Sequence, residues 1–339
     1  MYDVIIIGAG PAGCRTAELL AVGKKQVLVI EEHAKVGEPV QCTGLISAHL
    51  LDIHPDLPKN IVQKRIKTAR FFAPNGTNFS LSVKKPTLVV DRKKLDRWLA
   101  EKAKKACVSF KLGTKFIDFQ VKKDKIIVKT NKGNFETKVL IGADGPLSKV
   151  REIADIEADF QQQIFAQKTK TGMFKNEAQL RFGGEYFSWT VPISKTQARV
   201  GGVSSEMKRI WAEERSDGGT ERRGTAFAGT SGGVMRYGLL KSAQKGNVFL
   251  VGDAALQVKP FSCGGVVYGQ IGAECLAKSI LEDRDYDQLW KDRLAWPIRK
   301  GLLLCQFYSA PNWLQSLLIE IIVRTSSEKL LESLDMDFY

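Results

Sequence analysis

Short, unbroken runs of apolar residues alternate with helical patterns near the start of the chain. Residues 3–8 (Asp-Val-Ile-Ile-Ile-Gly) and 26–30 (Gln-Val-Leu-Val-Ile) are almost wholly apolar, as expected of strands buried on both faces of a parallel sheet. The stretch between them, from residue 14 to 22, is helical in pattern, and the runs 139–142 and 247–251 repeat the strand pattern. Strands that alternate with helices predict an α/β domain.

The middle of the chain has a different pattern. Residues 102–138 hold eleven lysines and three acids, interleaved with apolar residues in strand-like runs. They predict a small antiparallel sheet with one solvated face. Residues 212–234 contain six glycines, a composition that builds little core, and are predicted to form a mobile loop.

The carboxyl-terminal third is predicted to be helical, over residues 264–283 and 286–304 and within 301–323. The last segment is largely apolar but is interrupted by Pro311 and by polar residues, so it offers no uninterrupted apolar stretch of about 20 residues that would span a bilayer. Two interpretations stay open for it. Core helices are one, and an element resting on a membrane surface is the other, favoured by Trp313 and a basic total charge.

Composition and charge narrow the class of protein. The chain has 339 residues, 44% of them hydrophobic, which fits two domains or one large α/β unit. Its net charge of +14 favours an anionic partner such as a phospholipid surface or a diphosphate. No nucleic-acid-binding motif accompanies the lysines, so nucleic acid is not expected as a partner.

The cysteines and histidines indicate neither a disulfide scaffold nor a metal site. The six cysteines are scattered without a C-x-x-C pair, and the three histidines lack companions at ligand spacing. No secretory leader pattern opens the sequence. We therefore expect a cytoplasmic protein without a metal, with peripheral contact at the inner face of the membrane as the alternative.

The first motif is Gly8-Ala-Gly10-Pro-Ala-Gly13, which joins the first strand to the first helix. Gly8 permits a tight turn, Gly10 lets a pyrophosphate approach the backbone, and Gly13 lets helix and strand pack closely. Glu31 ends the second strand 23 residues after Gly8, where an acid accepts hydrogen bonds from adenosine ribose hydroxyls and disfavours the 2′-phosphate of NADP. The adjacent Glu32 is grouped with it, although a solvated acid is the simpler interpretation. The motif predicts a dinucleotide site.

Two further motifs indicate which dinucleotide binds. Gly142-Ala-Asp-Gly145 and Gly252-Asp-Ala-Ala255 each follow a buried strand, and they resemble the second and third FAD fingerprints of the flavoprotein hydroxylase superfamily, whose fold is typified by para-hydroxybenzoate hydroxylase. The resemblance implies that Asp253 binds the ribityl hydroxyls of FAD and that the glycines at 264–265 approach the flavin. Arg92 resembles a cofactor-contacting arginine of these proteins, with a surface ion pair as the alternative. The motifs and this resemblance assign to FAD the residues Gly8, Gly10, Ala12, Gly13, Glu31, Glu32, Arg92, Ala143, Asp144, Gly145, Asp253, Pro260, Gly264 and Gly265.

Residues 36–45 (Val-Gly-Glu-Pro-Val-Gln-Cys-Thr-Gly-Leu) resemble a loop of the geranylgeranyl reductase family. These flavoenzymes saturate isoprenoid chains. The resemblance covers most of residues 1–155 and 235–310, and it implies that Cys42 lies beside the flavin and the alkene as a catalytic residue. A small buried hydrophobic role for Cys42 is the alternative.

The family's aromatic substrate motif, P-x-x-Y-x-W-x-F-P, is only partly retained. Trp189 and Pro192 match it, whereas Phe187 stands at the tyrosine position. These three are the candidate substrate-binding residues. Tyr186 is next to Phe187 and is expected to point to the opposite side of a strand.

Together these features predict an α/β (α+β overall) fold: a Rossmann-like FAD-binding domain of the para-hydroxybenzoate hydroxylase type, an antiparallel-sheet substrate (cap) domain and C-terminal helices. The FAD-binding domain is predicted to comprise residues 1–65, 84–156 and 235–285, the cap domain 66–83 and 157–234, and the helical region 286–339.

The family resemblance implies an FAD-dependent reductase that acts on C=C bonds of geranylgeranyl chains in isoprenoid lipids or polyprenyl diphosphates. No second dinucleotide fingerprint is present in the sequence, so an electron donor, NAD(P)H or a ferredoxin, would bind transiently. A flavin-dependent monooxygenase or halogenase of the same fold is the alternative, and a non-enzymatic flavin-binding protein at the membrane is a third interpretation.

Overall fold

The computed structural model describes residues 1–207, 227–325 and 337, and the chain forms two compact units. The first unit is made of the segments Met1–Pro39, Arg92–Gln162 and Met235–Leu302. The second is made of Val40–Asp91, Gln163–Val234 and Leu303–Tyr339.

This division differs from the boundaries predicted from the sequence. Residues 40–65 and 84–91 were predicted in the FAD-binding domain but fall in the second unit, because their strands pair within the sheet of that unit. The predicted C-terminal region 286–339 is divided after Leu302.

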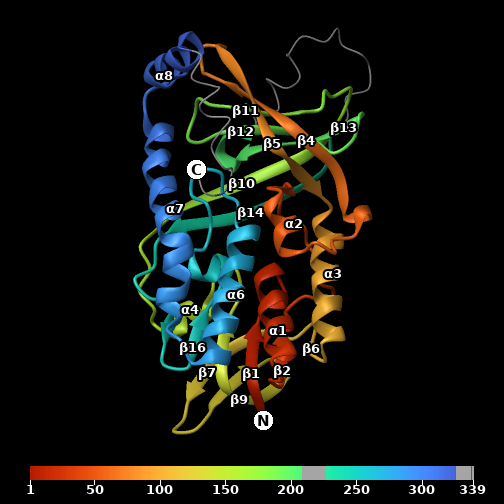
Figure 1. Ribbon diagram of the computed structural model, residues 1–339, viewed down its shortest axis with the longest axis vertical. Helices are drawn as coiled ribbons and strands as arrows, with labels where there is room; N and C mark the ends of the chain where they lie inside the picture. Colours follow the sequence, from red (N-terminus) through yellow and green to blue (C-terminus); the bar gives the residue numbers. More distant parts are fainter. Residues whose placement is uncertain (208–226, 326–336, 338–339) are drawn as a thin grey trace. The chain divides into compact units, whose positions relative to one another are not determined.

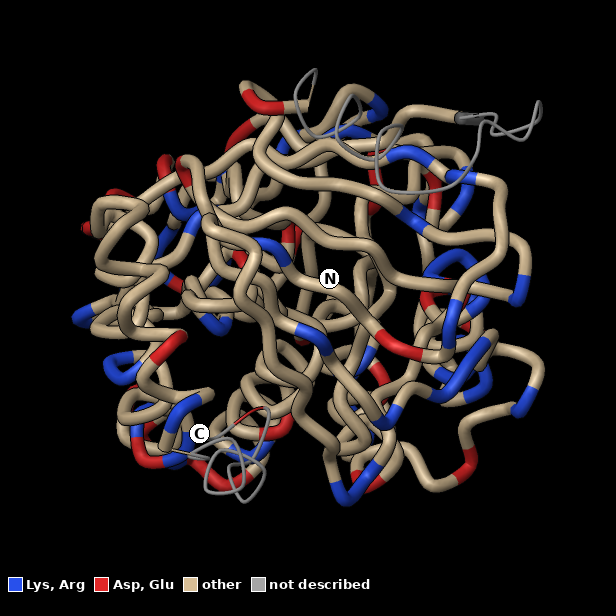
Figure 2. Tube along the Cα trace, turned by 90° about the horizontal axis from the view of Figure 1, so that it is seen from above, with Lys and Arg blue, Asp and Glu red and all other residues tan. Residues whose placement is uncertain are grey.

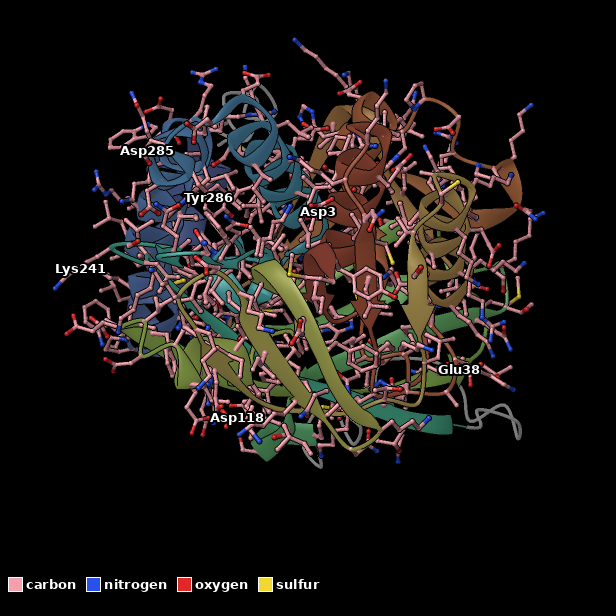
Figure 3. The ribbon with its side chains drawn as sticks, turned by 90° about the horizontal axis from the view of Figure 1, so that it is seen from below. Asp3, Glu38, Asp118, Lys241, Asp285 and Tyr286 are labelled. Atoms are coloured by element: carbon pink, nitrogen blue, oxygen red, sulfur yellow. The ribbon has the colours of Figure 1, made fainter. Side chains whose placement is uncertain are left out.

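The first unit is built on a sheet with the strand order β15-β16-β9-β1-β2-β6, in which β7 and β8 extend β9. Strands β16, β9, β1, β2 and β6 are parallel. Their bounds are β1 Tyr2–Ile7, β2 Val27–Ile30, β6 Ser109–Lys111, β7 Phe116–Val121, β8 Ile126–Thr130, β9 Gly133–Gly142, β15 Gln244–Lys245 and β16 Val248–Leu250. At the start of β1, Asp3 (Figure 3) accepts a hydrogen bond from the amide of Gln26 and pairs with Lys138 of β9, which ties the three central strands together.

Helices cover this parallel sheet. Helix α1 (Pro11–Val22) packs between α3 (Arg92–Lys105) and α6 (Val266–Glu282), as Figure 1 shows. The short helix α4 (Lys149–Ile153) follows β9, and the 3-10 turn η3 (Gly252–Ala255) follows β16. The predicted α/β architecture of the nucleotide-binding part is therefore confirmed.

The second unit contains a sheet with the order β14-β10-β13-β12-β11-β4-β5-β3. The pairs β10–β13, β13–β12, β12–β11, β4–β5 and β5–β3 are antiparallel, and β11–β4 is parallel. The bounds are β3 Leu45–Ile46, β4 Val62–Phe72, β5 Asn78–Val90, β10 Phe160–Thr171, β11 Glu177–Arg181, β12 Ser188–Pro192, β13 Gln197–Val203 and β14 Phe227–Gly238, with the helical turns α2 His49–Ile53, η1 Lys59–Ile61 and η2 Ser204–Glu206. One part of its core is the cluster of Ile66, Val89, Ala178 and Val191.

Three predictions about the rest of the chain have different outcomes. The antiparallel sheet within residues 102–138 is confirmed by the pairing of β7, β8 and β9. The mobile loop predicted at 212–234 is wrong for 227–234, which belong to β14, and residues 212–226 lie outside the described part. The C-terminal helices are confirmed as α7 (Tyr286–Ser309) and α8 (Asn312–Arg324).

Charge is spread along the whole chain. Figure 2 shows lysines and arginines interspersed with acids over the trace, which agrees with many short surface ion pairs rather than one isolated basic tail. In the part of the chain that the structure describes, no helix has the length and apolar character that crossing a bilayer requires.

Candidate functional site

The glycine-rich turn after β1 is held by close backbone contacts. Gly8 has φ +104°, and a Cβ there would lie 2.3 Å from the carbonyl oxygen of Ala143, at the end of β9. A Cβ on Gly13 would lie 2.1 Å from the carbonyl oxygen of Gly8. The ends of β1 and β9 and the start of α1 therefore meet at a distance that only glycine permits.

Gly10 differs from these two glycines. It precedes α1 in extended conformation, and a Cβ there would meet no atom within 4 Å. No side chain from the described residues caps α1 at this end, so its first amides are available to an anion. Open space beside free amides fits a pyrophosphate, which a methyl group at Gly10 would obstruct.

Ala12 lies where α1 packs against η3, which contains the third FAD motif (Gly252–Ala255), and against α6. A Cβ on Gly252 would lie 2.7 Å from the Cβ of Ala12, and one on Gly269 of α6 would lie 3.3 Å from it. Small residues at these three positions bring α1, η3 and α6 together. We infer that Ala12 acts through this packing.

Glu31 is fixed at the end of β2. Its Oε2 accepts a 2.8 Å hydrogen bond from the amide of Ala9, and its Oε1 accepts one of 3.0 Å from the amide of His33. The side chain is 13% exposed. Glu32, by contrast, is 54% exposed and lies 3.9 Å from the ammonium group of Lys115. Glu31 is thus held at the end of β2 by the glycine turn, whereas Glu32 is a surface acid.

Asp144 accepts hydrogen bonds at the start of α4, whose N-cap residue is Ser148. Its carboxylate accepts hydrogen bonds from the hydroxyl of Ser148 (2.6 Å) and from the amides of Lys149 (2.8 Å) and Val150 (3.1 Å) at the start of α4. Burial raises the pKa of Asp144, and these hydrogen bonds oppose the rise. Its visible role is to hold the β9–α4 turn, in which Gly145 has φ +79°.

Arg151 connects the second and third fingerprints. Its guanidinium donates to the carbonyl oxygens of Ala254 (2.7 Å) and Pro146 (3.0 Å), and the residue is only 4% exposed. Burial lowers the pKa of Arg151, and the nearby Arg236 lowers it further. The sequence analysis assigned no role to Arg151.

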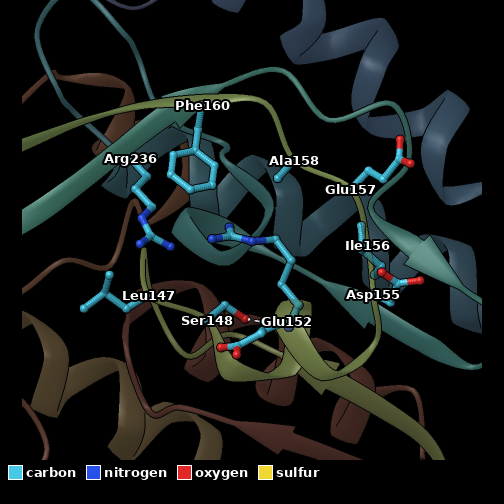
Figure 4. Close-up of a pocket in the computed structure, with 10 residues that line it drawn as sticks. Leu147, Ser148, Glu152, Asp155, Ile156, Glu157, Ala158, Phe160 and Arg236 are labelled. Carbon is cyan, nitrogen blue, oxygen red and sulfur yellow. Dashed lines mark hydrogen bonds between the residues drawn. The ribbon is translucent and has the colours of Figure 1, made fainter.

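A surface pocket of about 550 Å³ lies beside this connection (Figure 4). The guanidinium of Arg236 lies 4.4 Å from the ring centroid of Phe160, and that of Arg151 lies 5.5 Å from it. Figure 4 shows Arg236 and Leu147 at one end of the pocket and Asp155 and Glu157 at the other. Both arginines already bond carbonyl oxygens, so we interpret this pocket as the outer side of a structural connection.

Asp253 lies at the start of η3 against Gly265. A Cβ on Gly265 would be 2.4 Å from Oδ1 of Asp253, so glycine is required beside this carboxylate. Burial raises the pKa of Asp253, and the charge of Arg92 partly offsets the rise. In the described part of the chain, no donor forms a hydrogen bond to this carboxylate. An enclosed carboxylate of this kind fits the hydroxyls of a ribityl chain.

Arg92 is engaged by a neighbour on its own helix. Its guanidinium makes two 3.1 Å hydrogen bonds to the carboxylate of Asp96, and both side chains are largely buried. The alternative of a surface ion pair is therefore partly right: the pair exists, but it is sheltered, and its charge acts on Asp253.

The loop before α6 returns on itself. Lys259 and Gly264 form an antiparallel bridge across Pro260, and a Cβ on Gly264 would lie 2.7 Å from Cε of Lys259. The hydroxyl of Ser262 is buried without a hydrogen-bond partner among the described residues. An orphaned hydroxyl in this loop, next to glycines, fits a polar edge of a bound group.

A buried polar network behind η3 escaped the sequence analysis. The amide of Gly252 donates to Gln257 Oε1 (2.8 Å), Gln257 Nε2 donates to the hydroxyl of Tyr286 (3.0 Å), and that hydroxyl donates to the carbonyl oxygen of Leu250 (2.8 Å). Tyr286 is fully buried, and burial raises its pKa. Gln257 and Tyr286 are uncharged and 29 residues apart, so no sequence pattern indicates their hydrogen bond, and only the fold shows it.

Cys42 belongs to the second unit, where its loop is anchored to the sheet. The amide of Gly44 lies 3.3 Å from the sulfur of Cys42 and donates to it. The hydroxyl of Thr43 donates to Gln167 of β10 (2.9 Å), whose amide donates to Ser231 of β14 (3.2 Å). The thiol is partly exposed. The loop thus holds an accessible thiol in a fixed backbone.

Phe187 and Trp189 lie in an aromatic cluster of the second unit. Their ring centroids are 5.9 Å apart, and Trp189 lies 5.7 Å from Phe165. The indole N–H of Trp189 is buried without a hydrogen-bond partner among the described residues. Pro192 ends β12 and is buried by its pairing with Ala198.

The expectation for Tyr186 is wrong. Its ring lies 5.2 Å from that of Phe187 and 4.0 Å from that of Tyr308, so both neighbours join the same cluster. The physical reason is that β12 begins at Ser188, and the alternation of strand side chains does not apply before it. Tyr186 therefore supplies a phenol close to the position where the motif has tyrosine.

Comparison with known proteins agrees with these features. The family described as "FAD binding domain" matches residues 1–273. An uncharacterised protein of Methanocaldococcus jannaschii is 29% identical, over 89% of this chain and 82% of its own. A digeranylgeranylglycerophospholipid reductase of Methanocella arvoryzae is 31% identical, over 82% of this chain and 78% of its own.

Among solved structures, a geranylgeranyl bacteriochlorophyll reductase-like protein of Thermoplasma acidophilum superimposes with a TM-score of 0.83. The match covers 95% of this chain and 91% of the other at 20% identity. Flavin-dependent monooxygenases and halogenases share the fold as well. The predicted fold class, with its FAD-binding domain of the hydroxylase type, is confirmed.

Proposed function

The chain is an FAD-dependent reductase that belongs to the digeranylgeranylglycerophospholipid reductase family, and we propose that it saturates C=C bonds in the geranylgeranyl chains of an isoprenoid glycerophospholipid. The observation that carries the proposal is the relative from Methanocella arvoryzae, because most of both chains match. The geometry supports it, since all three FAD motifs lie at the carboxyl ends of neighbouring parallel strands.

The first unit supplies the residues that would hold FAD. The amides at the start of α1, with Gly10, receive the pyrophosphate, and Glu31 receives the ribose hydroxyls. Asp253 receives the ribityl chain, and the charge of Arg92 partly offsets the rise that burial causes in the pKa of this carboxyl. When bound, FAD supplies the hydride that reduces the alkene.

The second unit supplies the residues that we assign to the substrate. Phe187 and Trp189, joined by Tyr186, present aromatic surface to an apolar chain. The thiol of Cys42 is the group that we assign to proton delivery. Thr43 of this loop is hydrogen-bonded to Gln167 of β10 and to Arg199 of β13, which holds the sulfur at a defined place.

The electron donor and the membrane are the remaining partners. We propose that NAD(P)H or a ferredoxin reduces the cofactor in a transient complex. A glycerophospholipid substrate resides in a bilayer, so the protein is proposed to work in peripheral contact with a membrane surface.

Anaerobic mass spectrometry tests this function directly. FAD-loaded protein reduced with dithionite is mixed with a geranylgeranylated glycerophospholipid or with geranylgeranyl diphosphate, and the oxidised protein serves as the control. Addition of two hydrogens per double bond should raise the product mass accordingly. Unchanged masses of both substrates, together with oxygen-dependent turnover of an aromatic compound, would show a monooxygenase instead.

A further inference from the structure

Helix α8 buries two polar side chains and exposes several large apolar ones. Its buried face carries Gln315, Ser316 and Ile319. The exposed side carries Trp313, 68% exposed, and four large aliphatic side chains. These are Leu317 at 45%, Leu318 at 41%, Ile321 at 48% and Val323 at 37% exposed. A surface helix normally buries its apolar face, so the outward face of α8 is built to be covered.

Hydrogen bonds of polar side chains hold α8 in this orientation, although the side-chain oxygen of Gln315 is buried without a partner among the described residues. The side-chain amide of Gln315 donates to the carbonyl oxygen of Ala310 at 2.9 Å. Glu320 accepts a 2.8 Å hydrogen bond from Asn75, in the turn between β4 and β5. These bonds fix which side of α8 faces the sheet. The end of α7 adds Leu303, 65% exposed, and Leu304, 44% exposed.

The hairpin to which α8 is bonded is basic. Residues 62–90, which form β4, β5 and their turn, contain six basic residues and no acid. Arg65, Lys67 and Lys84 are exposed, and no carboxylate in the described part of the chain pairs with them. An apolar helix face joined to a hairpin of one charge sign is complementary to a surface that is both apolar and anionic.

We propose that the outward face of α8, together with the end of α7, inserts into the interface of an anionic lipid bilayer, with the β4–β5 hairpin adding electrostatic attraction. A second copy of the chain is a poorer occupant, because a contact through α8 would place two acid-free basic hairpins near each other. Trp313 suits the boundary between lipid headgroups and acyl chains, since its ring is apolar and its N–H is polar. This inference deepens the proposed function, from which the bilayer as the location of the substrate is taken.

Vesicle flotation tests the proposal without any turnover. Wild-type, FAD-loaded protein is mixed with phosphatidylglycerol vesicles, with phosphatidylcholine vesicles or with none. We expect binding to phosphatidylglycerol that weakens with salt. The triple variant Trp313→Ser/Leu317→Ser/Ile321→Ser should bind at least about tenfold more weakly, because it removes most of the inserted apolar area. Ile117→Ser/Val121→Ser, which changes exposed apolar residues of β7, is the matched control and should bind as wild type does.

A variant that removes the basic charge of the hairpin, and activity assays of the α8 variant, distinguish the remaining outcomes. Arg65→Gln/Lys67→Gln/Lys84→Gln should weaken binding to phosphatidylglycerol while melting temperature and FAD content stay unchanged. The α8 variant should reduce vesicle-embedded lipid slowly yet keep its activity on dispersed geranylgeranyl diphosphate. If the wild-type protein reduces neither substrate but still binds vesicles, the proposed function is contradicted and the membrane proposal is not. Equal vesicle binding by wild type and α8 variant, no vesicle binding by the wild type, or a wild-type dimer that the α8 variant abolishes would each overturn the membrane proposal.

Discussion

The amide of Ala9 donates a 2.8 Å hydrogen bond to Oε2 of Glu31, and this bond joins the glycine turn after β1 to the end of β2. The acid expected to receive the adenosine ribose therefore also fixes the turn expected to receive the pyrophosphate. Two halves of a dinucleotide site are coupled through one carboxylate, whose charge strengthens the bond from the amide.

Replacement of Glu31 should show this coupling. Glu31→Ala removes the acceptor for Ala9 and for the ribose, and hydrogen bonds to charged groups contribute about 1.5–3 kcal/mol, so FAD should bind about 10–100-fold more weakly. Glu31→Gln keeps a hydrogen-bond acceptor, so its affinity for FAD should lie between the affinities of Glu31→Ala and the wild type. Flavin fluorescence titration of the apoprotein measures both affinities.

Glu32 provides the matched control, since it is exposed and lies 3.9 Å from Lys115. Glu32→Ala should change the affinity by less than about threefold, as expected of a surface substitution. Wild-type affinity in Glu31→Ala would show that this carboxylate contributes nothing to the FAD site.

The glycines of the turn should separate folding from binding. A Cβ at Gly13 would lie 2.1 Å from the carbonyl oxygen of Gly8, so Gly13→Ala should destabilise the apoprotein by about 1–3 kcal/mol. A Cβ at Gly10 meets open space, so Gly10→Ala should leave stability unchanged within about 0.5 kcal/mol but weaken FAD binding. Urea unfolding and FAD titration of both variants check this. Undiminished FAD binding by Gly10→Ala would place the pyrophosphate elsewhere.

Much of the nucleotide-binding unit could be predicted from the sequence, because its signals are local. The buried strands are short apolar runs, and Gly8, Gly10 and Gly13 stand at fixed offsets from the end of the first. The β7–β8 hairpin followed from alternation within a few residues. Such patterns depend on backbone geometry alone, so they survive without knowledge of the tertiary contacts.

Other parts depend on contacts between distant residues. The hydrogen bond between Gln257 and Tyr286 exists because η3 and α7 meet, and neither residue marks it. Tyr186 was misplaced because a strand was assumed to begin before Ser188. The hydrogen bonds that Asp144 accepts at the start of α4 were also missed, because the N-cap residue is Ser148 and Asp144 lies four residues before it.

Asp253 should make the apoprotein less stable at neutral pH. Burial raises the pKa of this carboxyl, so it binds its proton more tightly in the folded state. Its contribution to stability is then greatest below its ordinary pKa and is lost as pH rises through the raised value. The Asp253→Asn apoprotein should therefore be more stable than wild type at neutral pH, with a difference that closes as the medium becomes acidic, while its affinity for FAD falls.

Urea unfolding of the apoproteins across the acidic and neutral range measures the difference. Asp118→Asn, at a partly exposed carboxyl on β7, is the matched control and should show no comparable gain. A neutral-pH stability of Asp253→Asn below that of wild type would mean that the ionised carboxylate is stabilised by the fold.

Cys42 should affect turnover without affecting cofactor content. Its sulfur accepts a 3.3 Å hydrogen bond from the amide of Gly44, in a loop that Thr43 ties to β10, so replacing the thiol should leave the backbone in place. If the thiol delivers the proton to the alkene, Cys42→Ala should lower turnover at least about tenfold, which corresponds to roughly 1.4 kcal/mol of transition-state stabilisation.

Cys42→Ser retains a proton donor and should keep more activity with a shifted pH profile. Cys107→Ser, at an exposed cysteine, controls for loss of a thiol as such. Wild-type turnover and pH profile in Cys42→Ala, measured by mass spectrometry of the reduced product, would assign Cys42 to packing alone.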